Sequence, residues 1–174
     1  YRPSHKHIDA WVDYVRRIVT RYGKKLRYWE VYNEPNLEHF WRTTPSGTEY
    51  AEFLKRTCET IKAIDPEIKV LYGGTSRIPL KFIEESYKAG AGKYFDIMCI
   101  HPYRWSDQPE TLLPELQALH KLMAQYQISQ PLWVTEMGYS TVLPPFYTEV
   151  LPAAFRRLNI TPENTTIGIV SDAD

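Results

Sequence analysis

The sequence predicts an α/β fold in which parallel β-strands are connected by α-helices. Segments with apolar residues at helical spacing alternate along the 174-residue chain with short segments rich in aromatic and β-branched residues. These short segments are almost continuously apolar, which is typical of strands covered on both faces. A helix lies between each strand and the next, so neighbouring strands are expected to be parallel. Two architectures meet these conditions, part of a (β/α) barrel and an open, doubly wound sheet.

The first half of the chain predicts two helices, each followed by a strand. Apolar residues recur at helical spacing over residues 8–22, and Gly23 ends this helix. Residues 26–32 (LRYWEVY) form the first predicted strand. After a polar stretch, a second helix has its apolar face over residues 50–64. Residues 68–74 (IKVLYGG) form the second strand, which ends in glycines.

The second half repeats the pattern twice and then loses it. Predicted elements lie at residues 80–87 (helix), 94–100 (strand), 112–126 (helix) and 131–136 (strand). After Tyr139 the pattern weakens, and residues 153–158 and 166–170 are weaker candidates for a helix and a strand. Because a complete barrel has about eight strands, the clear strands of this chain predict either a partial barrel or the open sheet.

The composition is that of an ordinary globular domain and argues against two classes of partner. Lys plus Arg and Asp plus Glu both number 21, so no basic face favours nucleic acid or an anionic membrane. The chain contains no apolar run of about 18 residues, the length that a membrane-spanning helix needs. Aromatic residues make up 14% of the chain, and their flat rings can fill a core or stack on sugars.

Neither a metal nor a cofactor is predicted. Cys58 lies in a helical pattern and Cys99 in a strand pattern, and both are interpreted as free, buried thiols. His5 and His7 are too close in sequence for a helical metal pair, which prefers positions i and i+4. The chain begins at Tyr1 and shows no signal peptide. Its localisation therefore stays open, with a secreted or periplasmic location compatible with a longer parent protein.

Reactive side chains follow the predicted strands at their carboxyl ends, where parallel α/β folds hold their active sites. Asn33 and Glu34 end the first strand, His101 and Tyr103 the third, and Glu136 the fourth. An open sheet would keep the first and fourth ends far apart, whereas a barrel curves them toward a common centre. Two carboxylates that face each other across a barrel mouth are typical of glycoside hydrolysis. The alternative is that each carboxylate is an ordinary solvated or ion-paired strand end.

Around these residues the sequence resembles the retaining glycosidases of clan A, which share a (β/α)8 barrel, and within them glycoside hydrolase family 39. The resemblance covers residues 8–141 and implies a partial TIM barrel, from about the third helix through the seventh strand. Residues 1–174 would then form a single partial catalytic domain, in which residues 142–174 match the family poorly. The motifs that carry the resemblance are WEVYNEPNLEHFW (29–41), IKAIDPEIKVLYGG (61–74), GKYFDIMCIHPY (92–103) and PLWVTEMGYST (131–141).

The resemblance implies roles for the residues at the strand ends. Glu34 would be the general acid/base and Glu136 the nucleophile. Asn33 would hydrogen-bond the sugar hydroxyl next to the anomeric carbon, and His101 and Tyr103 match the pair on the family's sixth strand, where the tyrosine can orient the nucleophile.

The sequence signals at three further residues are less specific. Trp41 and Trp105 fall on loops at the predicted mouth and are candidate stacking platforms for a sugar. The alternatives are that Trp41 packs against its own loop and that Trp105 forms a lid over the core. Glu30, in the middle of the first strand, is interpreted as a buried structural carboxylate that is hydrogen-bonded inside the barrel.

The predicted activity is hydrolysis of an oligosaccharide or polysaccharide by double displacement. Protonated Glu34 would donate to the leaving oxygen while ionised Glu136 attacks the anomeric carbon, and Glu34 would then activate the hydrolytic water. This mechanism needs no metal and no cofactor. One alternative is a carbohydrate-binding barrel without turnover, a pseudoenzyme or an inactive fragment, although the presence of both carboxylates favours the enzyme. A second is an open α/β binding domain with unrelated acids. The motifs specify neither the sugar nor its linkage, and they predict no oligomeric state.

Overall fold

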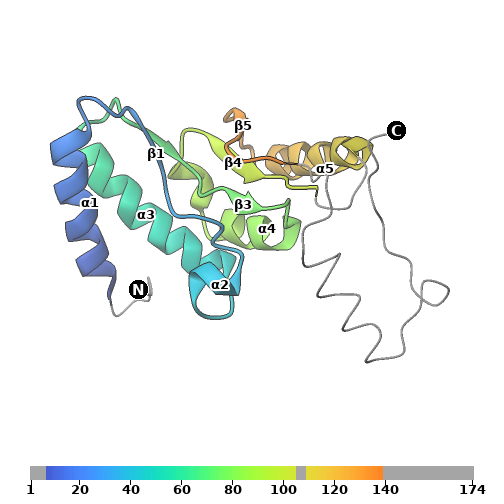
Figure 1. Ribbon diagram of the computed structural model, residues 1–174, viewed down its shortest axis with the longest axis horizontal. Helices are drawn as coiled ribbons and strands as arrows, with labels where there is room; N and C mark the ends of the chain where they lie inside the picture. The colour runs from blue at the N-terminus through green and yellow to red at the C-terminus, as the bar shows by residue number, and fades with distance from the viewer. Residues whose placement is uncertain (1–6, 105–108, 139–174) are drawn as a thin grey trace, which may run out of the picture.

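Figure 1 shows the computed structural model of the protein, which describes residues 7–104 and 109–138. Helices and strands alternate along this part of the chain, as the sequence predicts. The helices are α1 (Ile8–Tyr22), α2 (Glu38–Trp41), α3 (Gly47–Ile64), α4 (Leu80–Lys88) and α5 (Leu112–Gln125), with the 3-10 helices η2 (Ala91–Lys93) and η3 (Pro109–Thr111). The strands are β1 (Tyr28–Glu30), β2 (Lys69–Leu71), β3 (Thr75–Ser76), β4 (Met98–His101) and β5 (Leu132–Val134). The elements predicted at residues 153–158 and 166–170 lie outside the described residues.

The strands run parallel and follow one another across the sheet in chain order. β1 pairs with β2, and a bridge between Leu71 and Ile97 joins β2 to the segment that enters β4. β3 pairs with β4, which in turn pairs with β5. A doubly wound sheet would instead reverse its strand order partway. The predicted partial (β/α)8 barrel is therefore confirmed, and the open, doubly wound alternative is wrong.

One predicted strand is divided in two. The sequence predicts a single strand over residues 68–74, whereas the structure has β2 and β3 with Gly73 and Gly74 between them. A side chain on Gly73 would collide with the backbone of the segment that follows β1. The chain passes so close to that segment that only glycine fits at this point.

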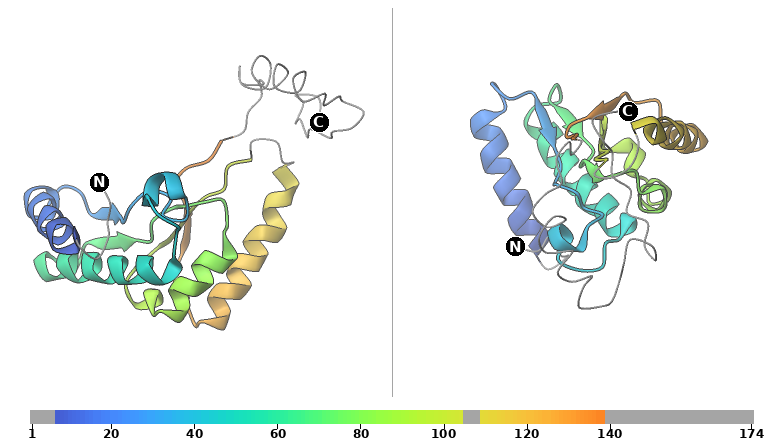
Figure 2. Two further views of the ribbon diagram at one scale, coloured as in Figure 1. Left: turned by 90° about the horizontal axis from the view of Figure 1, so that it is seen from below. Right: turned by 45° about the vertical axis from the view of Figure 1, so that its right-hand side comes forward.

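The four longer helices enclose the strands from one side. In Figure 2, α1, α3, α4 and α5 form an arc around the strands. Consecutive helices contact one another, α1 with α3, α3 with α4 and α4 with α5. The apolar faces predicted from helical spacing point into the space between this arc and the strands, and the resulting core is called the outer core below. Its fully buried members include Val19, Leu54, Tyr72, Ile83 and Ile100.

The opposite face of the strands carries much less apolar packing. Leu71, Ile97 and Cys99 form a separate small cluster, called the inner cluster below. Cys99 and Cys58 are both buried and free, as predicted, and burial raises the pKa of the Cys58 thiol to about 11. No described helix is long and apolar enough to cross a membrane.

Burial of the strands differs from the prediction at the two edges of the arc. All residues of β4 are buried, as expected for a strand covered on both faces. Tyr28 on β1 and Trp133 on β5 are exposed, although their rings contact each other at a centroid distance of 5.3 Å. Val134 is exposed as well. The prediction of strands covered on both faces is therefore wrong for β1 and β5, because no described element packs over these edges.

Candidate active site

The carboxyl ends of β1, β4 and β5 bring two carboxylates and a histidine together. Glu34 follows β1, His101 is the last residue of β4, and Glu136 follows β5. One carboxylate oxygen of each glutamate and one ring nitrogen of His101 all lie within 4.8 Å of one another. The convergence that the sequence predicts for these residues is present, although Glu34 and Glu136 are separated by most of the described chain.

Hydrogen bonds connect these groups through His101 and Tyr103. The Nδ1 atom of His101 lies 3.3 Å from Oε1 of Glu34 and 3.7 Å from Oε2 of Glu136. The hydroxyl of Tyr103 donates to Oε2 of Glu136 at 3.0 Å. Glu34 and His101 are buried, whereas the side chain of Glu136 is half exposed. The site therefore combines an enclosed carboxylate with one that is open to an incoming molecule.

The backbone that carries Glu34 has an unusual conformation. Glu34 has φ of 42° and Tyr32 has φ of 77°, both in the left-handed region that disfavours residues other than glycine. Each such residue costs about 1–3 kcal/mol and persists only where its surroundings hold it. Here the amide of Glu34 donates to the carbonyl oxygen of Gly74 at 2.9 Å, and the hydroxyl of Tyr32 donates to the carbonyl oxygen of Phe40 at 2.8 Å. Strain of this kind is common at functional sites.

Asn36, which is not among the predicted site residues, also holds this segment. Its Oδ1 accepts from the amide of Ser76 at 2.9 Å, and its Nδ2 donates to the carbonyl oxygen of the same residue at 3.1 Å. The side-chain amide thus pairs with the backbone of β3 as another strand would. The available signal was the asparagine that directly follows Pro35 at a strand end, a residue type that commonly bonds to backbone in turns.

A second tier of polar groups lies beneath the carboxylate pair. Oε1 of Glu30 accepts from the amide of Gly74 at 2.6 Å and from the hydroxyl of Thr135 at 3.1 Å. The same oxygen lies 3.5 Å from Nε2 of His101, which is itself 3.1 Å from the Thr135 hydroxyl. The interpretation of Glu30 as a hydrogen-bonded carboxylate is confirmed. Its predicted burial is wrong, because the side chain is 28% exposed on the open inner face.

These contacts shift the pKa of His101. Burial by itself lowers the pKa of the imidazole, but the hydrogen bonds with Glu30 and Glu34 and the charge of Glu136 outweigh it and raise the pKa above its ordinary value. The hydrogen bond to Glu136 likewise raises the pKa of Tyr103, so its phenol keeps the proton that it donates. Three donor groups, Glu34, His101 and Glu136, are close enough together to reach one cation.

The structure corrects the expectation for Trp41. The residue ends the short helix α2, in a stretch that the sequence predicts to be a polar loop. Its side chain is buried. The indole packs edge-on against Tyr32, Tyr50 and Phe53 at centroid distances of 5.6, 6.1 and 5.8 Å. It therefore offers no open face to a sugar, and its aromatic partners lie on α3 and in the segment after β1 rather than in its own loop. The physical reason is that α3 supplies aromatic rings that cover it.

Asn33 and Trp105 complete the predicted set. Asn33 is exposed and directly precedes Glu34, at the edge of the site. Trp105 lies outside the described residues, so its role as a stacking platform stays a prediction.

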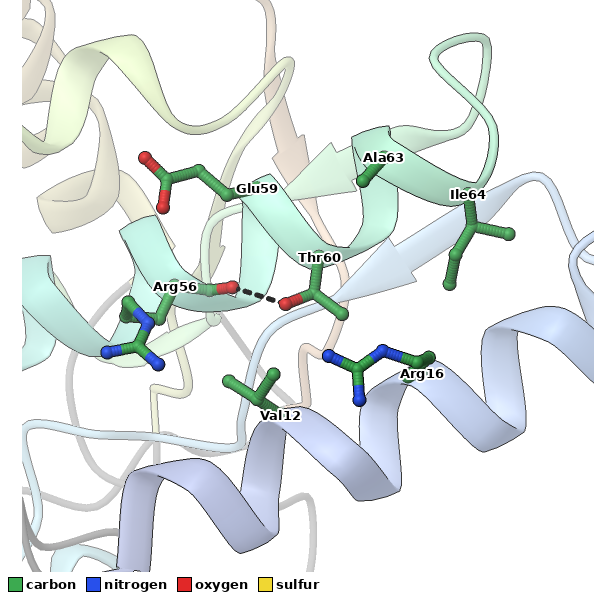
Figure 3. Close-up of a pocket in the computed structure, with 7 residues that line it drawn as sticks. All are labelled: Val12, Arg16, Arg56, Glu59, Thr60, Ala63 and Ile64. Carbon is green, nitrogen blue, oxygen red and sulfur yellow. Dashed lines mark hydrogen bonds between the residues drawn. The ribbon is translucent and has the colours of Figure 1, made fainter.

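A separate groove of about 500 Å³ lies on the helical side, between α1 and α3 (Figure 3). Its two guanidinium groups already form ion pairs, Arg16 with Asp13 at 3.6 Å and Arg56 with Asp9 at 3.0 Å. None of the carboxylates at the strand ends lines it. The residues that line it are Val12, Arg16, Arg56, Glu59, Thr60, Ala63 and Ile64.

The described chain is thus an arc of a (β/α)8 barrel with acidic groups where barrel enzymes hold their active sites. It belongs to glycosyl hydrolase family 39: the profile described as "Glycosyl hydrolases family 39" matches residues 4–156. The resemblance stated from the motifs is confirmed.

Individual relatives agree with this assignment. A curated protein named "Beta-xylosidase" from Geobacillus stearothermophilus is 27% identical over 179 residues, covering 86% of this chain and 35% of the relative. A solved family 39 β-xylosidase from Caulobacter crescentus has a TM-score of 0.61 at 21% identity, covering 95% of this chain and 38% of its own. The family 39 enzyme from Xanthomonas axonopodis pv. citri has a TM-score of 0.58 at 24% identity, covering 95% and 37%. At these identities the two structures show the fold alone, and this chain spans about a third of the relatives' length.

Proposed function

We propose that the protein is a retaining glycoside hydrolase in which Glu34 is the general acid/base and Glu136 the nucleophile. The observation that carries the proposal is the proximity of the two carboxylates, which have oxygens within 4.8 Å of each other. Retaining glycosidases hold their carboxyl groups about 5–5.5 Å apart, whereas inverting enzymes need about 6.5–9.5 Å to fit a water between them. The short separation supports direct attack by one carboxylate on the anomeric carbon.

The different surroundings of the two carboxylates support the division of roles. Glu136 is half exposed and accepts a hydrogen bond from Tyr103 through Oε2, so the tyrosine can hold the carboxylate while it attacks. Glu34 is buried beside His101 and stands on a backbone segment that is held in a strained conformation. A fixed, enclosed acid is suited to deliver its proton to one defined oxygen of the substrate.

The proposed reaction proceeds in two displacements. In the first, the proton of Glu34 passes to the glycosidic oxygen, the bond from that oxygen to the anomeric carbon breaks, and Glu136 forms an ester with that carbon. In the second, ionised Glu34 takes a proton from water, the hydroxide attacks the anomeric carbon, and Glu136 leaves as a carboxylate. Asn33 would hydrogen-bond the neighbouring sugar hydroxyl, and Trp105 is the remaining candidate for stacking on the sugar ring.

The substrate class follows from the same comparison. The relative from Geobacillus stearothermophilus is named a β-xylosidase, so β-linked xylosides are the first substrates to test. The broader proposal is an oligosaccharide or polysaccharide substrate, with no requirement for a metal or cofactor. We also propose that residues 1–174 contribute to one catalytic domain.

The test uses the full-length natural protein, with any sequence that extends this chain. Aryl β-xylosides and a panel of other aryl glycosides would be hydrolysed, with NMR used to determine the configuration of the first sugar released. A 2-deoxy-2-fluoro glycoside should leave an adduct on the peptide that contains Glu136, found by mass spectrometry. Glu136→Gln should abolish both turnover and adduct, whereas Glu84→Gln, the same change on the outer helix α4, should affect neither. An inverted product would contradict the mechanism, and binding without turnover would favour the non-catalytic carbohydrate-binding barrel.

A further inference from the structure

His101 connects two tiers of carboxylates through the opposite edges of its ring. Nδ1 faces the upper tier, at 3.3 Å from Glu34 and 3.7 Å from Glu136. Nε2 faces the lower tier, at 3.5 Å from Glu30 and 3.1 Å from the hydroxyl of Thr135. The ring is almost completely buried, so its orientation depends on these contacts. Any group that holds the Nε2 edge therefore also determines where the Nδ1 edge lies.

Glu30 is the group at the lower edge that connects the most elements. Its Oε1 accepts from the backbone amide of Gly74, just before β3, and from the hydroxyl of Thr135, just after β5. Glu30 itself belongs to β1, and His101 ends β4. One carboxylate oxygen thus contacts the connection between β2 and β3, the end of β4 and the residue that follows β5. Gly74 has no side chain at this position because a Cβ would collide with both the His101 ring and the Glu30 carboxylate.

We propose that Glu30 is a positioning residue of the active site: its carboxylate holds His101 so that the opposite edge of the ring lies between Glu34 and Glu136. This proposal rests on the proposed function, in which those two glutamates carry the reaction. Glu30 contacts His101 and not the reacting carboxylates, so we expect it to act through the imidazole.

Two consequences follow for the reaction. A ring whose Nε2–H faces Thr135 at 3.1 Å and Glu30 at 3.5 Å, and which also carries a proton on Nδ1, can donate that second proton toward Glu34, at 3.3 Å. When Glu34 has given its proton to the leaving oxygen, its new negative charge then lies beside a positive ring. The same Nδ1–H lies close to Glu136 and opposes the repulsion between the two carboxylates while Glu136 is ionised.

The electrostatic surroundings of His101 favour the charged form of its ring. Three carboxylates face it from three directions, Glu30 on β1, Glu34 after β1 and Glu136 after β5, and Thr135 adds a neutral hydroxyl. Burial lowers the pKa of His101, and the carboxylates, with Glu30 first among them, raise it to a net value above the ordinary one. Removing the charge of Glu30 should therefore lower the pKa of His101 and leave the other two carboxylates to hold the ring alone.

The experiment follows His101 by NMR in the full-length protein with labelled histidine, in which the signal is assigned with a His101→Gln variant. In the wild type near pH 7, we expect both ring nitrogens to be protonated. In Glu30→Gln, which keeps an acceptor for Gly74 and Thr135 but removes the charge, the titration midpoint should move to lower pH by about one pH unit or more. Glu84→Gln removes the same charge from the outer layer and should leave the midpoint in place.

Kinetics supply the second readout. Glu30→Gln should lower kcat on an aryl glycoside by about 10-fold to 100-fold with little change in KM, because a misplaced ring affects the reacting groups more than substrate binding. An unchanged midpoint in a folded Glu30→Gln variant overturns the proposal, as does an unchanged kcat. If that variant does not fold, a neutral His101 ring in the wild type near pH 7 overturns it as well. Absence of turnover in the wild type would count against the proposed function, while the NMR titration would still decide the Glu30–His101 contact.

Discussion

The two faces of the strand arc differ in composition, burial and backbone strain. The outer face packs against four helices, and its side chains, such as Tyr72 and Ile100, are fully buried. Among the residues that the structure describes, the inner face has the small cluster around Leu71, and beyond it the carboxylates and His101. β4 contributes to both faces, because alternate residues of a strand point to opposite sides. The two functions of a barrel wall, stability and chemistry, are therefore separated by one residue step along the same strand.

This comparison indicates where stability must come from. The inner face gathers three carboxylates around one ring and holds Tyr32 and Glu34 in strained backbone conformations, both of which lower the stability of the folded chain. The outer core must offset these costs through apolar burial. Substitutions on the two faces should accordingly have opposite signatures, with activity lost on the inner face and stability lost on the outer face.

The largest effect is expected at the acid of the inner face. Glu34→Gln should reduce kcat/KM for an aryl glycoside with a poor leaving group by about 100-fold to 10,000-fold, the range for loss of a general acid/base. Its melting temperature should not fall, because the amide has nearly the same shape as the carboxyl group that it replaces. Glu38→Gln, four residues away at an exposed position on the short helix α2, is the control and should retain full activity. Equal activity in the two variants would remove Glu34 from the proposed mechanism.

The opposite signature is expected in the outer core. Leu54 on α3 is fully buried, and Leu54→Ala should lower the free energy of unfolding by about 2–5 kcal/mol through lost burial and the cavity left behind. The activity per folded molecule should stay near that of the wild type. Leu113→Ala makes the same change at an exposed position on α5 and should cost less than about 0.5 kcal/mol. Urea denaturation and active-site titration would separate stability from activity, and a selective loss of kcat in Leu54→Ala would contradict the division between faces.

A substitution at Gly74 should affect both properties, because this residue lies where the inner tier is most tightly packed. A methyl group would displace the His101 ring or the Glu30 carboxylate, so Gly74→Ala should lower stability by about 1–3 kcal/mol and kcat by about 10-fold or more. Gly90→Ala is the comparison: its φ of 90° makes alanine strained, at roughly 1–2 kcal/mol, but nothing surrounds its Cβ position. A normal kcat in Gly74→Ala would mean that the ring can move without consequence.

The element order and the meeting of Glu34, His101, Tyr103 and Glu136 could be predicted because both depend on local pattern. Helical spacing and apolar runs locate the elements, and parallel strands in a barrel bring their carboxyl ends to one side. The identity of the end residues then follows from the sequence. Predicting which residues lie at the strand ends does not require the register between the strands.

The contacts that hold the site together depend on that register and could not be predicted. The pairing of Asn36 with Ser76 and the contact of Glu30 with Thr135 join residues 40 and 105 positions apart. Which atoms meet over such separations is decided only when the strands pair. The burial of Trp41 likewise depends on how α3 packs. An aromatic residue in a polar stretch shows no sign of this in the sequence.

The smallest effect is expected at the hydroxyl of Tyr103, where a single hydrogen bond of the inner face can be tested. Tyr103→Phe removes the hydrogen bond of 3.0 Å to Glu136 and leaves the ring, so kcat should fall by roughly fivefold to tenfold, the equivalent of about 1 kcal/mol. Stability should change by less than about 0.5 kcal/mol, because Glu136 is half exposed and water can replace the lost donor. Tyr28→Phe is the matched control: its ring contacts Trp133 on the same open side of the strands and should leave kcat unchanged. If both variants lowered kcat equally, the effect would belong to the inner face in general rather than to the hydrogen bond that holds Glu136.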